Sequence, residues 1–160
     1  MFNPFSIEGK TILITGAASG MGKATAIACA KMGAKVVGAD FNEEGLSKTL
    51  SELEGEDHQS FVVNLAEENT WTDLLTNAPV FDGIANCAGI ANMNPFMFVN
   101  RDEFDKVFNI NFFGPVLLTK SIIKQRNSIR EAPSCSWLRR TAILLFTQGT
   151  PCILQVRVLL

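Results

Sequence analysis

The sequence predicts an α/β fold in which helices cover both faces of a doubly wound parallel sheet. Short apolar segments alternate with segments of helical character as far as residue 125. The apolar segments are continuous runs, as expected for strands that are buried on both faces. The first run leads directly into a glycine-rich turn. Alternation of this kind predicts parallel strands joined by right-handed crossovers.

Four strands and four helices are expected in this region, without repeats or low-complexity segments. The strands are predicted at residues 11–15, 35–39, 59–63 and 82–86, and the helices near residues 20–32, 43–53, 67–76 and 101–125. The expected strand order is 3-2-1-4.

Residues 11–22 read T-I-L-I-T-G-A-A-S-G-M-G, a strand that runs into a turn and then into a helix. Gly16, Gly20 and Gly22 stand where the chain must turn sharply and come close to a bulky group. Unpaired N–H groups at a helix N-terminus and the helix dipole attract an anion, the dipole contributing about 0.3–1 kcal/mol per charge. The turn therefore predicts a pyrophosphate-binding site.

An acidic residue, Asp40, ends the second predicted strand roughly twenty residues after Gly16. In dinucleotide-binding folds an acid at this point hydrogen-bonds the ribose hydroxyls. Its charge would repel the 2′-phosphate of NADP, so NAD is the expected cofactor and NADP is disfavoured. The alternative is a solvated loop carboxylate that binds no ligand.

Four segments together resemble the short-chain dehydrogenase/reductase family, whose cofactor domain has a Rossmann-like fold. Residues 15–22 resemble its T-G-x-x-x-G-x-G motif, and N-C-A-G at residues 86–89 resembles its N-N-A-G motif. N-I-N-F-F-G at residues 109–114 resembles the N-x-N-x-x-G segment. Asn64 and Leu65 stand where the family usually has Asp-Val beside the adenine.

The resemblance covers residues 7 to about 125 and implies a set of site residues. The implied cofactor-binding residues are Thr15, Gly16, Ser19, Gly20, Met21, Gly22, Asp40, Asn64, Leu65, Asn86, Ala88 and Gly89. Asn111, the second Asn of its segment, has an implied catalytic role. Taken alone, Asn86 and Gly89 could simply form a turn, and Asn111 could be a mid-helix residue that back-bonds to a carbonyl.

Several aromatic residues and one histidine lie outside these motifs. Six phenylalanines could belong to the core, to a helix-packing interface or to a substrate pocket, namely Phe96, Phe98, Phe104, Phe108, Phe112 and Phe113. In the family the helix that carries Asn111 commonly pairs subunits, so a dimer face is a second interpretation. His58 is interpreted as a loop residue without a role.

The family's activity implies NAD-dependent hydride transfer to or from a small carbonyl or secondary alcohol. It also implies a proton-transferring Tyr, a Lys four residues later and a Ser that orients the substrate. The chain has no tyrosine, so of these catalytic residues only Asn111 has a match. A positioned proton donor contributes roughly 10²–10⁴ in rate, and little or no turnover is therefore expected. The alternatives are a non-catalytic dinucleotide-binding module and, less favoured, a methyltransferase or flavodoxin-like carrier.

The pattern changes near residue 126, which divides a dinucleotide-binding domain at residues 1–125 from an aberrant tail at residues 126–160. The beginning of the tail has neither helical nor strand period. Read one nucleotide out of frame, its codons permit G-G-S-I-V-F-V-A-S and then Y-T-A-S-K-G-A. These resemble the family's fifth strand with its Ser, followed by its Tyr and Lys. We therefore hypothesise that the tail is an out-of-frame translation.

The tail leaves two alternatives for the sheet. If it stays outside the fold, the sheet stops at four strands and the fourth becomes a bare edge, which invites pairing with other chains. Residues 143–146 or 152–160 could instead fill part of the gap. Because out-of-frame residues were never selected to fit, the sequence favours the first alternative.

Composition limits the partners. A chain of 160 residues that is 47% hydrophobic and 19% charged is expected to be a soluble globular domain. The net charge of −2 argues against nucleic acid, and no run is long enough to span a bilayer. Four cysteines without C-x-x-C spacing are expected to be reduced thiols, and no metal site is predicted. We expect a cytoplasmic protein, because no signal-peptide pattern is present.

Overall fold

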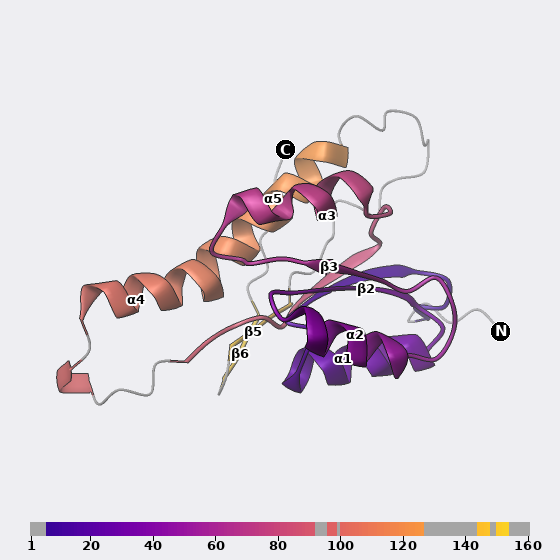
Figure 1. Ribbon diagram of the computed structural model, residues 1–160, viewed down its shortest axis with the longest axis horizontal. Helices are drawn as coiled ribbons and strands as arrows, with labels where there is room; N and C mark the ends of the chain where they lie inside the picture. The colour runs from indigo at the N-terminus through magenta and orange to yellow at the C-terminus, as the bar shows by residue number, and fades with distance from the viewer. Residues whose placement is uncertain (1–5, 92–95, 99, 127–143, 148–149, 154–160) are drawn as a thin grey trace.

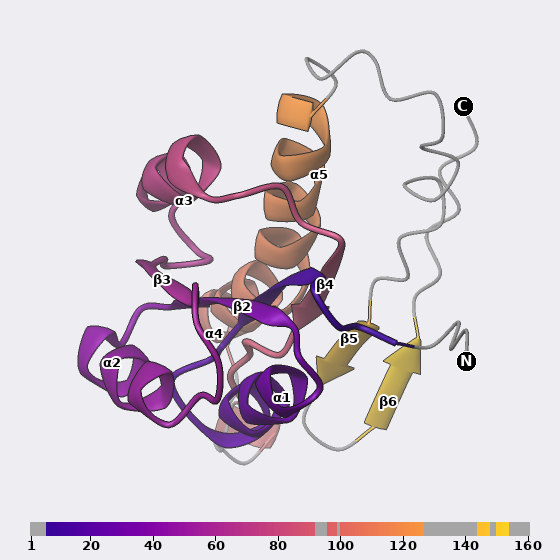
Figure 2. The same ribbon diagram turned by 90° about the vertical axis from the view of Figure 1, so that its right-hand side faces the viewer.

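The computed structural model describes residues 6–91, 96–98, 100–126, 144–147 and 150–153. These residues form a six-stranded sheet in the order β3-β2-β1-β4-β5-β6 (Figure 1). Helices lie on both faces of the sheet, as Figure 2 shows. The predicted doubly wound α/β fold is confirmed.

The four strands predicted before residue 126 are all present and parallel. They are β1 (Thr11–Thr15), β2 (Lys35–Asp40), β3 (Gln59–Val62) and β4 (Gly83–Asn86). β1 lies between β2 and β4, and β3 lies outside β2, so the predicted order 3-2-1-4 is confirmed. Leu13 and Ile14 in β1 are fully buried because the strand is covered on both faces.

Each face of the sheet has its own apolar core. α1 (Gly20–Lys31) and α2 (Glu43–Ser51) cover one face, where Ala26 and Leu46 pack with Ile14. On the other face are α3 (Thr72–Asn77), the short helix η1 (Glu68–Trp71) before it, and α5 (Gly114–Arg126). Leu74 and Leu118 from these helices belong to the second core. The sequence placed all these helices within a few residues.

The helix predicted at residues 101–125 is divided by a π-helical turn. α4 (Arg101–Phe108) follows the short helix η2 (Phe96–Phe98), and η3 (Asn109–Phe113) joins α4 to α5. In this turn the Gly114 N–H donates to the carbonyl of Asn109, five residues earlier. Pro115 has no N–H, so the Asn111 carbonyl lacks the donor that a continuous α-helix would supply there.

The tail contributes two strands, so the favoured expectation of a bare β4 edge is wrong. β5 (Leu144–Thr147) pairs in parallel with β4, with Leu144 opposite Ala85. β6 (Thr150–Ile153) pairs antiparallel with β5. A bare edge presents unpaired N–H and C=O groups, and β5 pairs with those of β4. The alternative strand at residues 143–146 is thus confirmed to within one residue.

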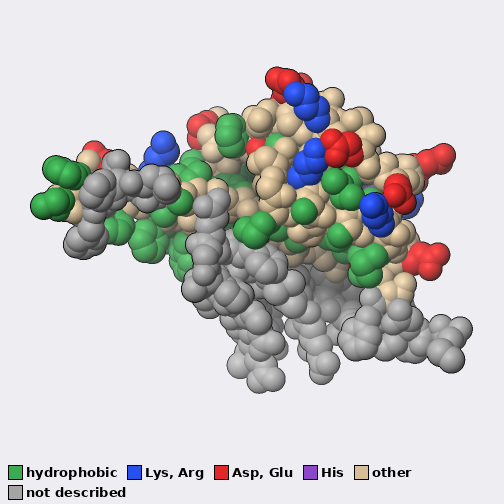
Figure 3. Space-filling model, turned by 90° about the horizontal axis from the view of Figure 1, so that it is seen from below, with side chains coloured by type: hydrophobic (Ala, Val, Ile, Leu, Met, Phe, Trp, Pro, Cys, Tyr) green, Lys and Arg blue, Asp and Glu red, His purple; other side chains and the backbone are tan. Residues whose placement is uncertain are grey.

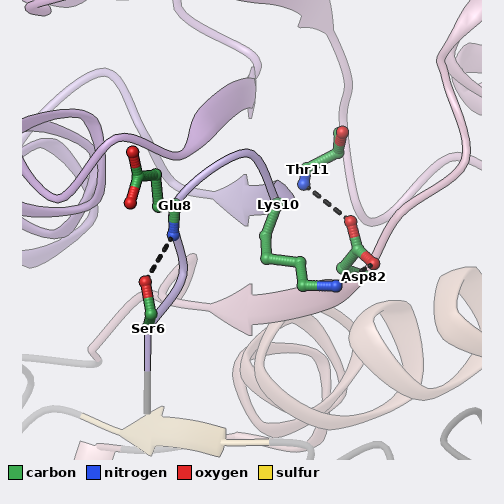
Figure 4. A network of polar contacts seen from close by, with 5 residues as sticks. All are labelled: Ser6, Glu8, Lys10, Thr11 and Asp82. Atoms are coloured by element: carbon green, nitrogen blue, oxygen red, sulfur yellow. Dashed lines mark hydrogen bonds and ion pairs between the residues drawn. The ribbon is translucent and has the colours of Figure 1, made fainter. Parts of the chain in front are cut away.

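The opening of β1 is tied to the segment before β4 by Asp82. Its Oδ2 accepts a hydrogen bond from the Thr11 N–H at 2.9 Å, and its Oδ1 lies 3.4 Å from the Lys10 ammonium (Figure 4). The Asp82 N–H donates in return to the Thr11 carbonyl at 2.8 Å. These bonds support the pairing of β1 with β4 at the amino ends of the two strands, opposite the glycine turn.

His58, for which the sequence suggested no role, extends the pairing of β2 and β3. Its Nδ1 accepts a hydrogen bond from the Val36 N–H at 3.0 Å. The other ring nitrogen, Nε2, lies 3.0 Å from the Glu54 carbonyl, so in the neutral ring it carries the proton and donates. His58 is therefore a structural residue.

Candidate functional site

A cleft of about 500 Å³ opens at the carboxyl ends of the parallel strands β1 to β4. In open parallel sheets this edge is where ligands bind. Every site residue named from the sequence lines the cleft except Asn86, which lies buried at the end of β4. The fold thus brings together the four segments that the sequence singled out.

The glycine turn is held by steric constraints that only glycine meets. Gly16 has a φ of +72°, and a Cβ there would lie 2.7 Å from the backbone nitrogen of Ala88. Gly22 has no unusual φ, but a Cβ there would overlap the carbonyl oxygen of Gly16. Gly20 has a φ of +51°, and a Cβ there would meet no atom within 4 Å. The first and third glycines therefore permit close packing, and the space beside the second is open.

The start of α1 presents backbone donors to the cleft. The Lys23 N–H makes the first helical hydrogen bond, to the Ser19 carbonyl at 3.0 Å. The N–H groups of Gly20, Met21 and Gly22 precede that ladder. The Ser19 side chain makes no capping bond, and the first turn carries no acidic residue. This arrangement attracts an anion and has no internal carboxylate in the first turn to compete with it.

Asp40 lies at the end of β2 and holds two neighbouring loops. Its Oδ2 accepts a hydrogen bond from the Ala18 N–H at 3.1 Å, which links β2 to the glycine turn. Its Oδ1 accepts from the Asn42 N–H at 3.0 Å. The carboxylate is fixed by these bonds at the cleft wall. Each oxygen retains acceptor capacity for a ligand hydroxyl.

Asn64 and Leu65 line the cleft after β3, but the Asn64 side chain is engaged within its own loop. Its Oδ1 accepts from the Ala66 N–H at 3.1 Å, and its Nδ2 donates to Glu67 at 2.7 Å. Its carbonyl accepts from the Trp71 indole N–H at 2.9 Å. Asn64 therefore orders this wall, and one amide proton remains for a ligand.

The segment after β4 crosses close to the glycine turn. The Ala88 N–H donates to Thr15 Oγ1 at 3.3 Å, so a buried threonine at the end of β1 holds it in place. Asn86 is 2% exposed, and its amide nitrogen and oxygen have no hydrogen-bonding partner among the described residues. Unpartnered buried amides are rare, and a buried water is the usual partner.

Asn111 lies in the π-helical turn and binds the backbone of the segment after β4. Its Oδ1 accepts from the Ile90 N–H and its Nδ2 donates to the Ile90 carbonyl, both at 2.8 Å. Gly89 leaves room for this contact, since a Cβ there would lie 3.3 Å from Asn111 Oδ1. The side chain thus joins the helix to the cleft wall, and the backbone carbonyl of Asn111 has no α-helical donor because residue 115 is proline.

Two cysteines are half-buried and free: Cys87 lines the cleft, and both Cys87 and Cys29 pack against the core beneath α1. Burial raises the pKa of Cys29, and the neighbouring Cys87 raises it further. Burial also raises the pKa of Cys87, although a contact with Thr25 Oγ1 at 4.0 Å partly offsets that effect. Both side chains are therefore neutral thiols at neutral pH, and neither is an activated nucleophile.

Eight further residues line the cleft that sequence reasoning had not named as site residues: Ala18, Ala39, Phe41, Asn42, Val63, Cys87, Ile90 and Ile110. Phe41 could have been found, because it directly follows Asp40 and interrupts a polar stretch. Of the phenylalanines left open between core, helix-packing interface and substrate pocket, five do not line the cleft and are exposed, which excludes the core for them: Phe98, Phe104, Phe108, Phe112 and Phe113. Hydrophobic side chains gather over α4 and the turn before it, at the left of Figure 3.

The fold and cleft have known counterparts. The family model for short chain dehydrogenases matches residues 10–130. A 3-oxoacyl-[acyl-carrier-protein] reductase, FabG, of Thermotoga maritima is 33% identical over 131 residues, which cover 76% of this chain and 53% of that protein. Short chain dehydrogenase/reductase dpfgG of Gibberella zeae is 36% identical over 125 residues, covering 74% and 46%. The chain thus spans about half the length of the curated relatives it matches.

Solved structures give the same result. The citronellol catabolism dehydrogenase AtuB of Pseudomonas aeruginosa superposes with a TM-score of 0.68 at 28% identity. The match covers 78% of this chain and 54% of that one. Among the described residues, no helix has the length and apolar character needed to cross a membrane.

Proposed function

The chain belongs to the short-chain dehydrogenase family, and from this premise we propose that its cleft binds NAD(H). The observation that carries the proposal is the glycine turn at the start of α1, with Asp40 at the end of the adjacent strand. The bound cofactor would supply hydride exchange with a small carbonyl or alcohol. Titration with NADH tests it, and saturable binding is the expected result.

The residues fit the parts of such a cofactor. The N–H groups of Gly20 to Gly22 would bind the pyrophosphate, with Ser19 Oγ beside them. Asp40 would accept hydrogen bonds from the adenosine ribose, and the wall at Asn64 and Leu65 would contact the base. Ala88 and Gly89 would lie along the middle of the cofactor. Asn86 lies buried at the end of β4 beneath them.

The choice of NAD over NADP rests on the charge of Asp40. A 2′-phosphate on the ribose would lie against this carboxylate, which is already fixed by Ala18 and Asn42. Two unit charges 4 Å apart repel by about 1 kcal/mol even in water, equivalent to ~5-fold in affinity. Asp40→Asn should therefore raise NADPH affinity relative to NADH by ~5-fold or more. An unchanged ratio of dissociation constants would contradict this role.

Cofactor binding does not by itself give catalysis, which also needs residues that transfer a proton. Asn111 would support proton transfer through its backbone carbonyl, but the sequence has no tyrosine to deliver the proton. We therefore expect NADH binding with little or no turnover. NADH absorbance with a panel of ketones and aldehydes measures it. Turnover at the level of ordinary relatives would refute the expectation.

A non-catalytic dinucleotide-binding module is the second candidate. The absence of tyrosine from the sequence favours it, because a chain without the proton donor can still bind the cofactor. A protein that is selected for binding should be soluble and melt cooperatively, with a higher Tm when NAD is added. A damaged enzyme should be poorly soluble. Because both candidates bind the cofactor, solubility and the cooperativity of the melting curve distinguish the two.

We also propose that residues from about 126–130 onward are read out of frame from an ordinary reductase gene. The family match extends only to residue 130, which supports this division of the chain. The catalytic Tyr and Lys would then lie in the shifted frame. Sequencing the gene decides it: a shifted frame without Tyr-x-x-x-Lys would exclude the idea.

The proposed setting is a cytoplasmic protein with a small-molecule substrate in the intact parent enzyme and no affinity for nucleic acid. Two copies would pair through α4, where Phe104 and Phe108 are exposed one helical turn apart. Sedimentation of the protein and of a Phe104→Ser, Phe108→Ser variant measures this. A monomer at all concentrations would exclude the pairing.

A further inference from the structure

Cys87 is the only thiol among the described residues that line the cleft. It directly follows β4 and is half-buried, so a small molecule in the cleft can reach its sulfur. The proposed binding of NAD(H) uses the neighbouring Ala88 and Gly89 and assigns nothing to the Cys87 side chain. A nucleophilic group at the cleft therefore has no role in the function proposed above.

A second thiol, Cys29, lies beside Cys87 on α1. The Cys87 sulfur lies 4.0 Å from Thr25 Oγ1. Thr25 and Cys29 are four residues apart on α1, which places them on one face of the helix with their Cβ atoms about 5–6 Å apart. Both cysteines also pack against the same apolar core, which contains Ile14 and Ala26.

The ionisation of the two thiols agrees with this placement. Burial is the main cause of the raised pKa of Cys29, and repulsion by the neighbouring Cys87 raises it further. Such repulsion falls with distance, so it acts between groups that are close together. The two sulfurs belong to different parts of the chain, the first helix and the segment after β4, and only the fold makes them neighbours.

We propose that Cys87 and Cys29 form a thiol–disulfide exchange site that reacts with small-molecule disulfides, such as oxidised glutathione, entering the cleft. The chemistry needs a thiol that the disulfide can reach and a second thiol behind it. Cys87 meets the first requirement because it lines the cleft, and Cys29 meets the second. The inference is independent of the cofactor, because it concerns the reactivity of the two sulfurs alone.

The reaction has two balanced steps. Cys87 loses its proton to solvent, and its thiolate attacks one sulfur of the disulfide RSSR. A bond forms between Cys87 and that sulfur, the S–S bond of the reagent breaks, and RS⁻ leaves. The Cys29 thiolate then attacks the Cys87 sulfur, the internal disulfide forms, and the second RS⁻ leaves. The protein gives up two electrons and two protons, and the reagent becomes two molecules of RSH.

The environment of the thiols predicts how fast this exchange runs. Burial raises the pKa of both groups, so little thiolate exists at neutral pH and the exchange should be slow there. Its rate should rise roughly tenfold for each unit of pH below the pKa of the thiol, because the thiolate is the attacking species. Thiolates of high pKa are also poor leaving groups, so the internal disulfide should be opened slowly by added thiol.

The experiment treats the full chain with oxidised glutathione and locates the products by intact mass and peptide mapping. The Cys29–Cys87 disulfide should predominate over every other pairing of the four cysteines. The same reaction in urea is the control, since that preference should disappear once the fold is lost. The pH dependence of the rate is measured on the native chain.

Two variants separate the roles of the thiols. Cys29→Ala should stop at a glutathione adduct on Cys87, because the second thiol is missing. Cys87→Ala should react ~10-fold or more slowly at Cys29, since access to the reagent limits exchange. Cooperative melting of both variants excludes misfolding as the cause of a changed reaction.

Three results would overturn the inference. One is a Cys29–Cys87 disulfide that is no more frequent in the native chain than in urea. Another is a parent chain that retains the glutathione adduct on Cys87, which would show that Cys29 does not reach it. The third is an equal rate in the parent and in Cys87→Ala. Binding of NADH is not measured, so failure of the proposed function would leave this test unaffected.

Discussion

At the scale of single residues, the glycines of the turn act through distances to backbone atoms. Gly16 requires both a positive φ and close packing against Ala88, whereas Gly22 requires only the absence of a Cβ. The carbonyl of Gly16 occupies the space where a side chain at Gly22 would begin. The shape of the anion site therefore depends on one contact between two glycines.

Gly22→Ala tests this contact. The added Cβ would overlap the Gly16 carbonyl, and relief requires the turn or the start of α1 to move. We expect unfolding free energy to fall by about 2 kcal/mol or more, near the upper part of the range for overpacking, with loss of NADH binding. Gly9→Ala is the control, because its φ is +70° and nothing lies within 4 Å. It should cost about 1 kcal/mol and leave binding intact. Equal effects of both changes would contradict the steric argument.

Asn111 provides a second residue-scale prediction. Asn111→Ala removes two hydrogen bonds to the Ile90 backbone and leaves both groups to water or unpaired. We expect a loss of about 2 kcal/mol in denaturant unfolding, at about 1 kcal/mol per bond. Asn109→Ala, an exposed residue in the same π-helical turn, is the matched control and should change stability by less than about 0.5 kcal/mol. A similar cost for the two would show that the helix, and not the bridge, is affected.

At the scale of elements, α1 packs against the sheet through small residues. Ala26 and Ala30 are buried there, and Cys29 and Cys87 pack against the same core. The two thiols have raised pKa values because this packing keeps them partly from water. The folded state therefore favours the protonated form of both thiols, so the stability of the α1 interface depends on pH.

The sign of that coupling gives a prediction. In the unfolded chain the thiols ionise near the ordinary value of 9.0, whereas the folded state retains their protons to higher pH. The folded state then binds more protons, so stability falls as pH rises above about 9. Melting temperature between pH 8 and pH 10.5 should decline more steeply in the parent than in a Cys29→Ala, Cys87→Ala variant. Parallel curves would exclude the coupling.

At the scale of the whole molecule, the β4–β5 pairing joins the tail to the dinucleotide-binding region. β5 lies between β4 and β6, so it is an interior strand of the sheet. β6 is the edge, and the proline at position 151 lies there. Edge strands tolerate proline because one of their N–H rows has no partner in the sheet.

Leu145→Pro tests whether the tail completes the sheet. Leu145 lies opposite Asn86 in the parallel pair and opposite Cys152 in the antiparallel pair. Proline removes the N–H of an interior strand, so we expect a clearly lower Tm and faster aggregation as the β4 edge is uncovered. Leu145→Ala retains the N–H and should have the smaller effect. If the two variants melt alike, the β4–β5 ladder does not contribute to stability.

The sequence alone determined the alternation of strands and helices, the order 3-2-1-4 and the residues around the cleft. These follow from local patterns: continuous apolar runs, glycines in a turn, and an acid at the end of a strand. The resemblance of residues 109–114 to the family's N-x-N-x-x-G segment also implied that Asn111 belongs to the site. The hydrogen bonds between the Asn111 side chain and the Ile90 backbone could not be predicted from the sequence. They depend on how the π-helical turn packs against the loop after β4.

Only the tertiary structure decided the exposure of Phe41, the buried state of Asn86, the π-helical turn and the partner of β4. Each depends on contacts between segments far apart in the chain. The pairing of β5 differs most from the sequence-based expectation. The unpaired edge of β4 is satisfied by backbone N–H and C=O groups, which a segment of almost any sequence can supply. The side-chain pattern of the tail therefore did not predict this pairing.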